Sequence, residues 1–265
     1  MDRVEVLDHG FVGAVDFWGS EEGIIEAARM STQKGFLGWG VEEACDHCGG
    51  SAHEPGYGPN HGCRECGAAQ ATGRKINKPG DEKLLRFLWE NKHHTPFEMA
   101  GATFEVQAPI FVFREWHRHR VPFGYNEMSA RYAPLPDVNY VPTVGRLLTN
   151  SKANRQAGTL KDAAELTDGG AMLFRSMLED QYAAAEWLYR DALRNGVPKE
   201  LARVVLPVGR YSKMRATSNL RGWLGFLALR NAPNAQHEIR VYAEAVQAML
   251  AEKFPRTLAL FAEKR

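Results

Sequence analysis

The most informative segment of this chain runs from Trp116 to Tyr132 and reads WHRHRVPFGYNEMSARY. It contains three arginines, two histidines, one glutamate, one serine and one asparagine. Arginine presents a planar fork of donors that matches phosphate oxygens, and serine adds a neutral donor. The segment therefore predicts a site for a phosphorylated, polar ligand. The alternative is a solvated basic surface or an ion-pair network, which charge runs commonly form. The interleaved Val121, Phe123 and Tyr125 favour partial burial.

On either side of this segment, hydrophobic periodicity predicts an α+β fold with short strands in the first half of the chain and helices in the second. Strands are expected at residues 4–7, 11–17 and 103–113. Helices are expected at residues 20–30, from 81 onward, at 170–195 and at 235–249. Ser20 and Asp81 are the expected helix caps, and Pro109 indicates a strand edge or a bulge. Residues 146–170 are polar and are expected to form a surface loop with frayed helix.

Composition limits the class of protein. The chain has 265 residues, 44% of them hydrophobic, which suits one catalytic domain over residues 1–265 with a sizeable core. Its 33 basic and 32 acidic residues leave a net charge of +1, so bulk charge does not indicate a nucleic-acid partner. The sequence shows no apolar run of about 18 residues and no signal-peptide core. We therefore expect a soluble, cytoplasmic protein that binds neither membrane nor nucleic acid.

All four cysteines lie in a glycine-rich segment, at Cys45, Cys48, Cys63 and Cys66. Two CxxC pairs separated by 14 residues are typical of a tetrahedral zinc site with four thiolate ligands. The sequence thus predicts an inserted zinc-ribbon-like module at residues 40–72 with structural zinc. Reduced thiols in a loop are the alternative. Such a ribbon also raises a rival function, a nucleic-acid- or protein-binding module, although its basic residues are few.

Several ordered blocks of the chain resemble the flavin-dependent thymidylate synthase (ThyX) family. The family's signature usually reads RHRxxSxNExSxRY, and this chain has RHR at 118–120, NE at 126–127 and SARY at 129–132. The other matching blocks, in order, are AARMS at 27–31, HHTPFE at 93–98, LARVVLP at 201–207, NLR at 219–221, and LR at 229–230 followed by Gln236 and Glu238. Several ordered blocks are far more specific than one short motif.

The resemblance implies a ThyX-like fold, an antiparallel sheet flanked by helices, in a homotetramer with active sites at subunit interfaces. By match, FAD contacts are expected at Ser31, His93, Thr95, Glu98, Arg118, His119, Arg120, Asn219, Arg221 and, less directly, Asn234. Contacts to a uridine nucleotide are expected at Arg118, Glu127, Ser129, Ala130, Arg131, Arg203 and Arg230.

The resemblance also implies the chemistry. Methylenetetrahydrofolate supplies a methylene to C5 of a uridine monophosphate, reduced FAD supplies a hydride, and NADPH reloads the flavin without any cysteine nucleophile. The cofactor carries the difficult step, so the protein orients and polarises. Arg230 is expected to stabilise negative charge on the uracil ring, His93 to order water or the flavin, and Arg118 to lie at the flavin–nucleotide boundary. A structural histidine is the alternative for His93.

One segment and three single positions depart from the family's pattern. Residues 122–125 (PFGY) replace the commoner residues in the middle of the signature. Glu115 stands where glutamine is expected, Asn234 where histidine is common, and Gly225 where asparagine is common. Glu115 is a further candidate substrate contact, because a carboxylate offers an acceptor to a ribose 2′-hydroxyl; UMP is therefore a candidate substrate beside dUMP. C5-hydroxymethylation, in which the methylene is hydrated instead of reduced, is the second alternative.

Overall fold

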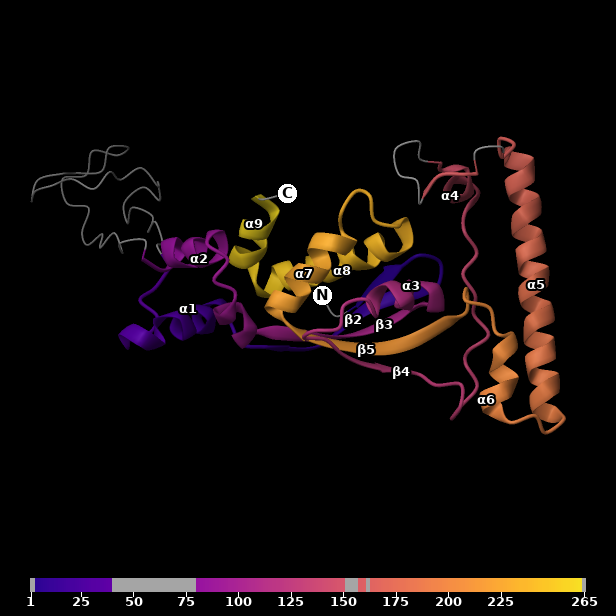
Figure 1. Ribbon diagram of the computed structural model, residues 1–265, viewed down its shortest axis with the longest axis horizontal. Coiled ribbons are helices and arrows are strands. Elements are labelled where there is room, and N and C mark those ends of the chain that lie inside the picture. Colours follow the sequence, from indigo (N-terminus) through magenta and orange to yellow (C-terminus); the bar gives the residue numbers. More distant parts are fainter. Residues whose placement is uncertain (1–2, 40–79, 151–156, 161–162, 264–265) are drawn as a thin grey trace, which may run out of the picture.

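The fold is built on one five-stranded antiparallel sheet. The computed structural model describes residues 3–39, 80–150, 157–160 and 163–263. The strands follow the order β1 (Arg3–Val6), β2 (Gly10–Trp18), β3 (Gly101–Pro109), β5 (Tyr211–Asn219) and β4 (Gly124–Glu127). Helices α3, α7 and α8 lie over one face of this sheet, and the long helix α5 crosses one end of it (Figure 1). The predicted α+β class, with an antiparallel sheet flanked by helices, is confirmed.

The first helices show one confirmed and one wrong prediction. Helix α1 (Glu21–Arg29) begins where expected, because the Ser20 hydroxyl accepts a hydrogen bond from the Gly23 amide at 3.1 Å. It continues into the short helix η1 (Met30–Thr32). Helix α2 (Gly80–Glu90) is not capped by Asp81, which lies inside its first turn. The buried Asp81 carboxylate accepts instead from the Arg29 guanidinium and, at 2.6 Å, from the Leu37 amide.

The predicted strand at residues 103–113 is wrong in its second half. The strand β3 ends at Pro109, and the apolar run that follows forms helix α3 (Ile110–Trp116). A short continuous apolar run fits a buried strand and a buried helix equally well, so its periodicity could not distinguish them. Pro109 marks neither an edge nor a bulge, because β3 lies between β2 and β5 and the proline is simply its last residue.

Strand β5 was missed because the second half of the chain was expected to be helical. Its burial alternates as a half-buried strand requires, with Met214 and Ala216 buried and Arg215 exposed between them. It pairs with β3 over its whole length and with β4 on its other side. The missed strand is therefore central to the sheet.

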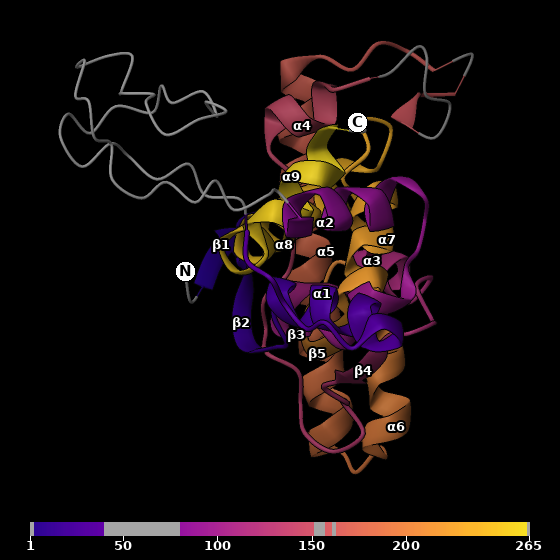
Figure 2. The same cartoon turned by 90° about the vertical axis from the view of Figure 1, so that its left-hand side faces the viewer.

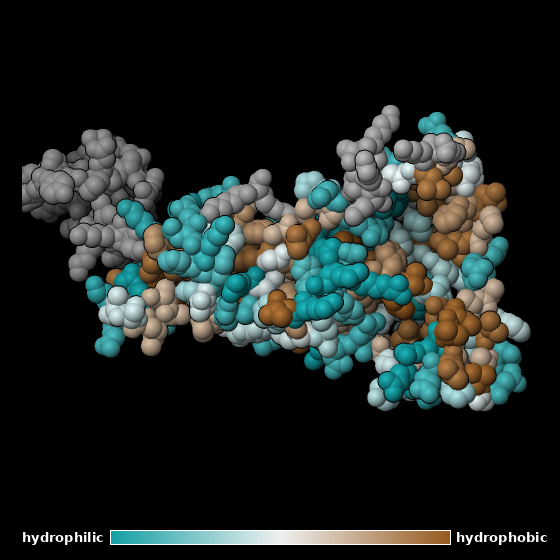
Figure 3. All heavy atoms as spheres, in the orientation of Figure 1, coloured by the Kyte–Doolittle hydropathy of each residue, from teal (hydrophilic) through white to brown (hydrophobic). Residues whose placement is uncertain are grey.

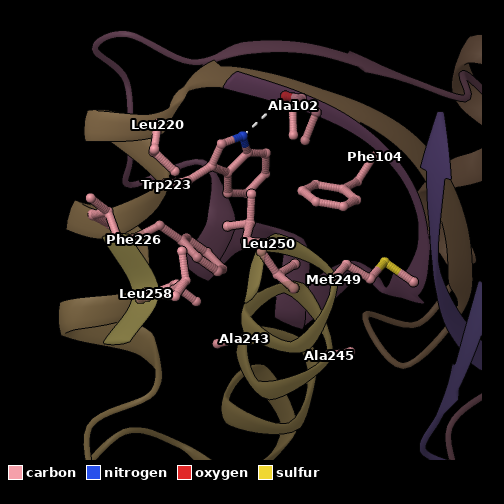
Figure 4. Close-up of a cluster of buried hydrophobic side chains, with 14 of the residues drawn as sticks. Ala102, Phe104, Leu220, Trp223, Phe226, Ala243, Ala245, Met249, Leu250 and Leu258 are labelled. Carbon is pink, nitrogen blue, oxygen red and sulfur yellow. Dashed lines mark hydrogen bonds between the residues drawn. The ribbon is translucent and has the colours of Figure 1, made fainter. Parts of the chain in front are cut away.

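The core lies between the sheet and the C-terminal helices α7 (Leu220–Arg230), α8 (His237–Lys253) and α9 (Pro255–Glu263). Figure 4 shows Trp223 at its centre, where the indole donates to the Ala102 carbonyl at 3.0 Å and packs edge-on against Phe104. The predicted apolar face of the last amphipathic helix is confirmed, since Ile239, Tyr242, Val246 and Met249 are all buried; Ala235 precedes the helix.

The predicted helix at residues 170–195 is confirmed as α5 (Asp168–Arg194), which Thr167 caps by accepting from the Gly170 amide. Between residues 144 and 148 the chain forms the short helix α4 (Val144–Leu148), and after α5 come α6 (Lys199–Ala202) and η4 (Arg203–Val205). Buried Arg210 anchors α5 to the sheet through Glu186 at 2.5 Å.

The predicted four-cysteine module at residues 40–72, with its ligands Cys45, Cys48, Cys63 and Cys66, lies outside the described residues. The described residues contain no cluster of three or more potential metal ligands. Among the helices of the described ranges, none is both long and apolar enough to cross a membrane.

Candidate active site

Four of the ten predicted flavin contacts, Thr95, Glu98, Asn219 and Arg221, meet at one end of the sheet. There the short helix η2 (Thr95–Met99) precedes β3, while Asn219 ends β5 opposite Gly101. The Asn219 side chain caps α7 by accepting from the Gly222 amide at 2.9 Å. An ion pair of 2.5 Å joins Arg221 to Glu98 and so ties the first turn of α7 to η2. Predicted contacts from two separate blocks of sequence, residues 93–98 and 219–221, are thus brought together by local capping and one charge pair.

A cavity of about 490 Å³ adjoins this cluster. Its walls are mainly apolar and come from α2, η2, α7 and α9; the lining residues are Trp89, His94, Phe97, Arg221, Leu224, Gly225, Ala228 and Phe261. A Cβ added at Gly225 would meet no atom within 4 Å, so glycine there is not required by packing inside the chain. Apolar walls with a cation at the mouth fit a planar ring that carries phosphate, as FAD does.

The two neighbouring histidines occupy different surroundings. His94 lines the cavity, and its pKa is lowered by burial and by nearby Arg221. His93, the predicted contact, is exposed and packs edge-on against Phe87 with ring centroids 5.5 Å apart. Ser31 is exposed in η1. The cavity wall is therefore formed by the second histidine of the pair.

A second cluster joins the end of α3 to the end of α7. Arg230 donates through Nε to His119 Nε2 at 2.9 Å and through one Nη to the Glu115 carboxylate. Its other Nη donates to the Glu115 carbonyl at 3.0 Å. Three contacts fix the plane of the guanidinium, whose side chain is 18% exposed. The residue expected to face the uracil ring is thus held rigidly and mostly out of solvent.

The aromatic residues of the signature support this cluster. Trp116 is fully buried, and Phe123 stacks on Tyr125 with ring centroids 5.6 Å apart. The Tyr125 hydroxyl lies 2.9 Å and 2.8 Å from the carbonyl oxygens of Trp116 and His119, and burial raises its pKa. Partial burial of the signature is therefore confirmed at these residues, but not at Val121, which is 91% exposed.

The contact between Arg230 and His119 requires a neutral imidazole, because His119 Nε2 is the acceptor. Burial, then the charge of Arg230, lowers the pKa of His119 from its ordinary 6.5 to about 4. Since the folded state disfavours the protonated ring, the stability contributed by this group is complete above about pH 6.5 and is lost as pH falls toward about 4.

We expect this loss to appear in urea unfolding between pH 7 and pH 4, and to be smaller in a His119→Gln variant, whose amide does not titrate in this range. A direct check is the NMR titration of the His119 ring in the folded protein. A midpoint near 6.5 would show that the contact with Arg230 does not form in solution.

The predicted phosphate contacts lie at the opposite end of β5. After β4, the Ser129 hydroxyl accepts from the Arg131 amide at 3.3 Å, and Ala130 is buried. Lys199 donates to the Tyr132 carbonyl at 3.0 Å and so places α6, and Arg203 after it, beside this turn. The guanidinium groups of Arg131 and Arg203 are exposed and available to an anion.

The remaining predicted residues fall between or beside these clusters. Arg118 and Arg120 are exposed on the loop after α3, and Asn234 is exposed on the loop before α8. Glu127 ends β4, where its carboxylate lies 4.0 Å from His117. Nothing in the sequence pointed to the Lys199 contact with a backbone carbonyl. The cavity's apolar wall was visible only as the apolar stripe of α2, which does not reveal whether a residue faces a core or a cavity.

Comparison with known proteins identifies the family to which a chain with this site belongs. The family model described as thymidylate synthase complementing protein matches residues 14–256. A flavin-dependent thymidylate synthase from Thermus thermophilus is 34% identical over 260 residues, which cover 98% of this chain and 78% of that protein. The chain belongs to the flavin-dependent thymidylate synthase family. It is therefore an enzyme, a flavin-dependent nucleotide methyltransferase.

Two further matches support the assignment to the flavin-dependent thymidylate synthase family. The protein of the same name from Gluconobacter oxydans is 33% identical over 261 residues, which cover 98% of this chain and 73% of that protein. Among solved structures, the UMP/dUMP methylase PolB from Streptomyces cacaoi, bound with 5-Br dUMP, superimposes with a TM-score of 0.71 at 29% identity. The match covers 98% of this chain and 97% of PolB.

Proposed function

We propose that this enzyme methylates C5 of a uridine monophosphate, dUMP, UMP or both, using FAD, methylenetetrahydrofolate and NADPH. The observation that carries the proposal is the guanidinium of Arg230, which Glu115 and His119 hold in a fixed plane. Negative charge builds on the uracil ring as C5 becomes a nucleophile. A preoriented, partly desolvated cation stabilises such charge without reorganising during the reaction.

The other clusters supply binding. Arg131 and Arg203, with the hydroxyl of Ser129, suit the nucleotide phosphate, and Glu127 suits a sugar hydroxyl. The Arg221–Glu98 pair and the adjoining cavity would hold FAD, which would supply the hydride when bound and reduced. Arg118 and Arg120 border both clusters in sequence and suit the flavin pyrophosphate.

We further propose that the complete site forms between subunits of a homotetramer. The Met128 amide bonds to the Lys213 carbonyl, six residues along β5 from Asn219. At about 3.3 Å per residue, the phosphate and flavin groups of one chain are separated by roughly 20 Å. A second chain that brings its own groups alongside would shorten this gap.

Helix α5 offers a surface for such an assembly. Figure 3 shows apolar side chains gathered at the end of the molecule where α5 and α6 lie. The exposed apolar residues of these helices include Met172, Leu173, Met177, Trp187 and Leu201, each at least 60% exposed. Leu188, on the same helix α5, is 45% exposed. A large exposed apolar surface along one helix is typical of a subunit contact.

Discrimination between dUMP and UMP is proposed to depend on Glu115. The Glu115 carboxylate is already bonded to Arg230. It would therefore accept a hydrogen bond from a ribose 2′-hydroxyl while it keeps that ion pair. PolB, the similar solved structure, is described as a UMP/dUMP methylase and is seen with both 5-Br dUMP and 5-Br UMP. We therefore keep both nucleotides as substrates and C5-hydroxymethylation as the alternative outcome.

The test is product analysis. Purified protein with FAD and NADPH is incubated with dUMP or UMP and isotopically labelled methylenetetrahydrofolate, and the nucleotides are separated by mass. We expect a labelled methyl group on at least one nucleotide. A product with an added oxygen would identify a hydroxymethylase, and no UMP product would remove the ribonucleotide from the proposal.

The four cysteines are proposed to bind structural zinc within a module at residues 40–72 of a single catalytic domain, on their CxxC spacing alone. Zinc content and flavin absorbance, measured on the same purified sample, separate this from the rival function. Zinc with no flavin binding would favour a nucleic-acid- or protein-binding module.

A further inference from the structure

An open groove of about 550 Å³ runs between α1 and α2, apart from the three clusters above. The two helices contact each other at the end of the molecule opposite α5 (Figures 1 and 2). Arg29, Thr32 and Lys34 line one wall, and Lys83, Leu84 and Phe87 line the other. None of the described residues that line the groove is acidic.

The charges of this groove are arranged for an anion. Lys34 and Lys83 are exposed on opposite walls, and neither forms an ion pair within the described part of the chain. Arg29, which lines the same wall as Lys34, is instead fixed by its ion pair with the buried carboxylate of Asp81. Two lysines that face one groove without a carboxylate between them create a positive potential there.

The groove also has an apolar portion. Phe87 is 50% exposed on its wall beside partly buried Leu84. The ring of Phe87 contacts the ring of His93, and Ser31 directly precedes Thr32 on the other wall. His93 and Ser31 are both predicted flavin contacts. If FAD contacts these two residues as proposed, a ligand in the groove would adjoin the flavin and would lie along Phe87 as well as the lysines.

We propose that this groove binds the polyglutamate tail of the folate cosubstrate, an inference that rests on the proposed function. In methylenetetrahydrofolate the pterin end carries the methylene group, a benzoyl ring follows, and glutamates linked in series then present one carboxylate after another. Phe87 and Leu84 suit the ring, while Lys34 and Lys83 suit the carboxylates. Lysine is a compact charge on a flexible stem, which matches carboxylates spread along a flexible chain.

The phosphates of NADPH are the competing occupant, and the geometry favours them less. A phosphate is best held by converging donors, above all by the fork of an arginine. Here the only arginine in the described lining is already bonded to Asp81, and the two lysines come from opposite walls. The groove, at about 550 Å³, is also larger than a single phosphate requires.

The first experiment measures binding without turnover. The probes are p-aminobenzoyl-monoglutamate and p-aminobenzoyl-tetraglutamate, titrated by calorimetry into the FAD-loaded enzyme at low salt. We expect the longer probe to bind roughly tenfold more tightly, since two exposed charge pairs together contribute about that factor. The double variant Lys34→Glu/Lys83→Glu should lose the preference. The control Lys253→Glu, which reverses an exposed lysine at the end of α8, should keep it.

The second experiment uses turnover. In the double variant, KM for tetraglutamyl methylenetetrahydrofolate should rise roughly tenfold, while kcat and KM for the monoglutamyl form, the nucleotide and NADPH stay as in the wild type. Equal affinity of the wild type for both probes, or a preference that survives in the double variant, would overturn the proposal. A raised KM for NADPH instead would assign the groove to that coenzyme.

The two proposals fail separately. If the holoenzyme shows the tail preference and the double variant loses it, but no methylated nucleotide forms, the proposed reaction is wrong and the groove still binds an anionic tail. If methylation proceeds and neither probe distinguishes the variant, the reaction stands and the groove assignment is wrong.

Discussion

Replacing Arg230 with alanine is expected to lower kcat for nucleotide methylation by about 10²–10³-fold, the usual cost of removing one preoriented donor that faces developing negative charge. FAD binding should persist, because the cavity and the Arg221–Glu98 pair belong to a different cluster. Arg230→Lys should recover only part of the rate. Lysine keeps the charge but cannot bond at once to His119, to the Glu115 carboxylate and to the Glu115 carbonyl.

The measurement is single-turnover product formation on flavin-loaded variants, with flavin absorbance recorded for each. Arg194→Ala is the matched control, because it truncates an arginine that is 68% exposed on α5. A kcat for Arg230→Ala close to that of the control would show that the charge on the uracil ring is stabilised elsewhere.

Replacing Glu186 with alanine is expected to have the largest effect on stability. Arg210 has a fully buried side chain, and Glu186, 10% exposed, is its partner at 2.5 Å. Asp137 at 3.2 Å and the Pro136 carbonyl at 2.7 Å remain, but the Asp137 side chain is 43% exposed. Leaving a buried guanidinium without its main counter-charge typically lowers the free energy of unfolding by about 3–5 kcal/mol.

Urea unfolding at a fixed protein concentration measures this effect, since any subunit association would shift the apparent stability. The control is Arg190→Ala, which removes the other, 63% exposed partner of Glu186 and should change stability little. Replacing Glu186 and Arg210 together by apolar residues of similar size should recover much of the loss. If Glu186→Ala unfolds like the wild type, Arg210 is not anchored as the structure shows.

The parts of the fold that could be predicted are those set by local sequence. Helix α1 has its serine cap, and α8 repeats apolar residues at helical spacing. The parts that failed depend on context. The run after Pro109 became a helix because three of its residues, Val112, Phe113 and Trp116, pack into the core on one helical face. Strand β5 (YSKMRATSN) is mostly polar and has few large apolar residues, so its strand signal is weak until β3 and β4 lie beside it.

The candidate site shows the same division. Motif resemblance named Arg230, Glu115 and His119, but the bonds among them join residues more than 100 positions apart. Such contacts arise when α3 and α7 pack, and no spacing along the chain announces them. The sequence marks Glu115 only as a residue that differs from the one expected at its position. The structure shows that its carboxylate is bonded to Arg230, the expected catalytic arginine.

Asp81 also bears on how this chain tolerates changes in its length. Its carboxylate receives the Leu37 amide, and the indole of Trp39 is held by Glu22 at 2.8 Å. Leu37 and Asp81 therefore lie at adjoining points of the described fold. The entropic cost of closing a loop grows only slowly with its length. A connection between two such adjoining points therefore tolerates insertions of very different lengths. A protein engineer could therefore lengthen or shorten the chain between these two points at little cost to the fold that carries the nucleotide chemistry.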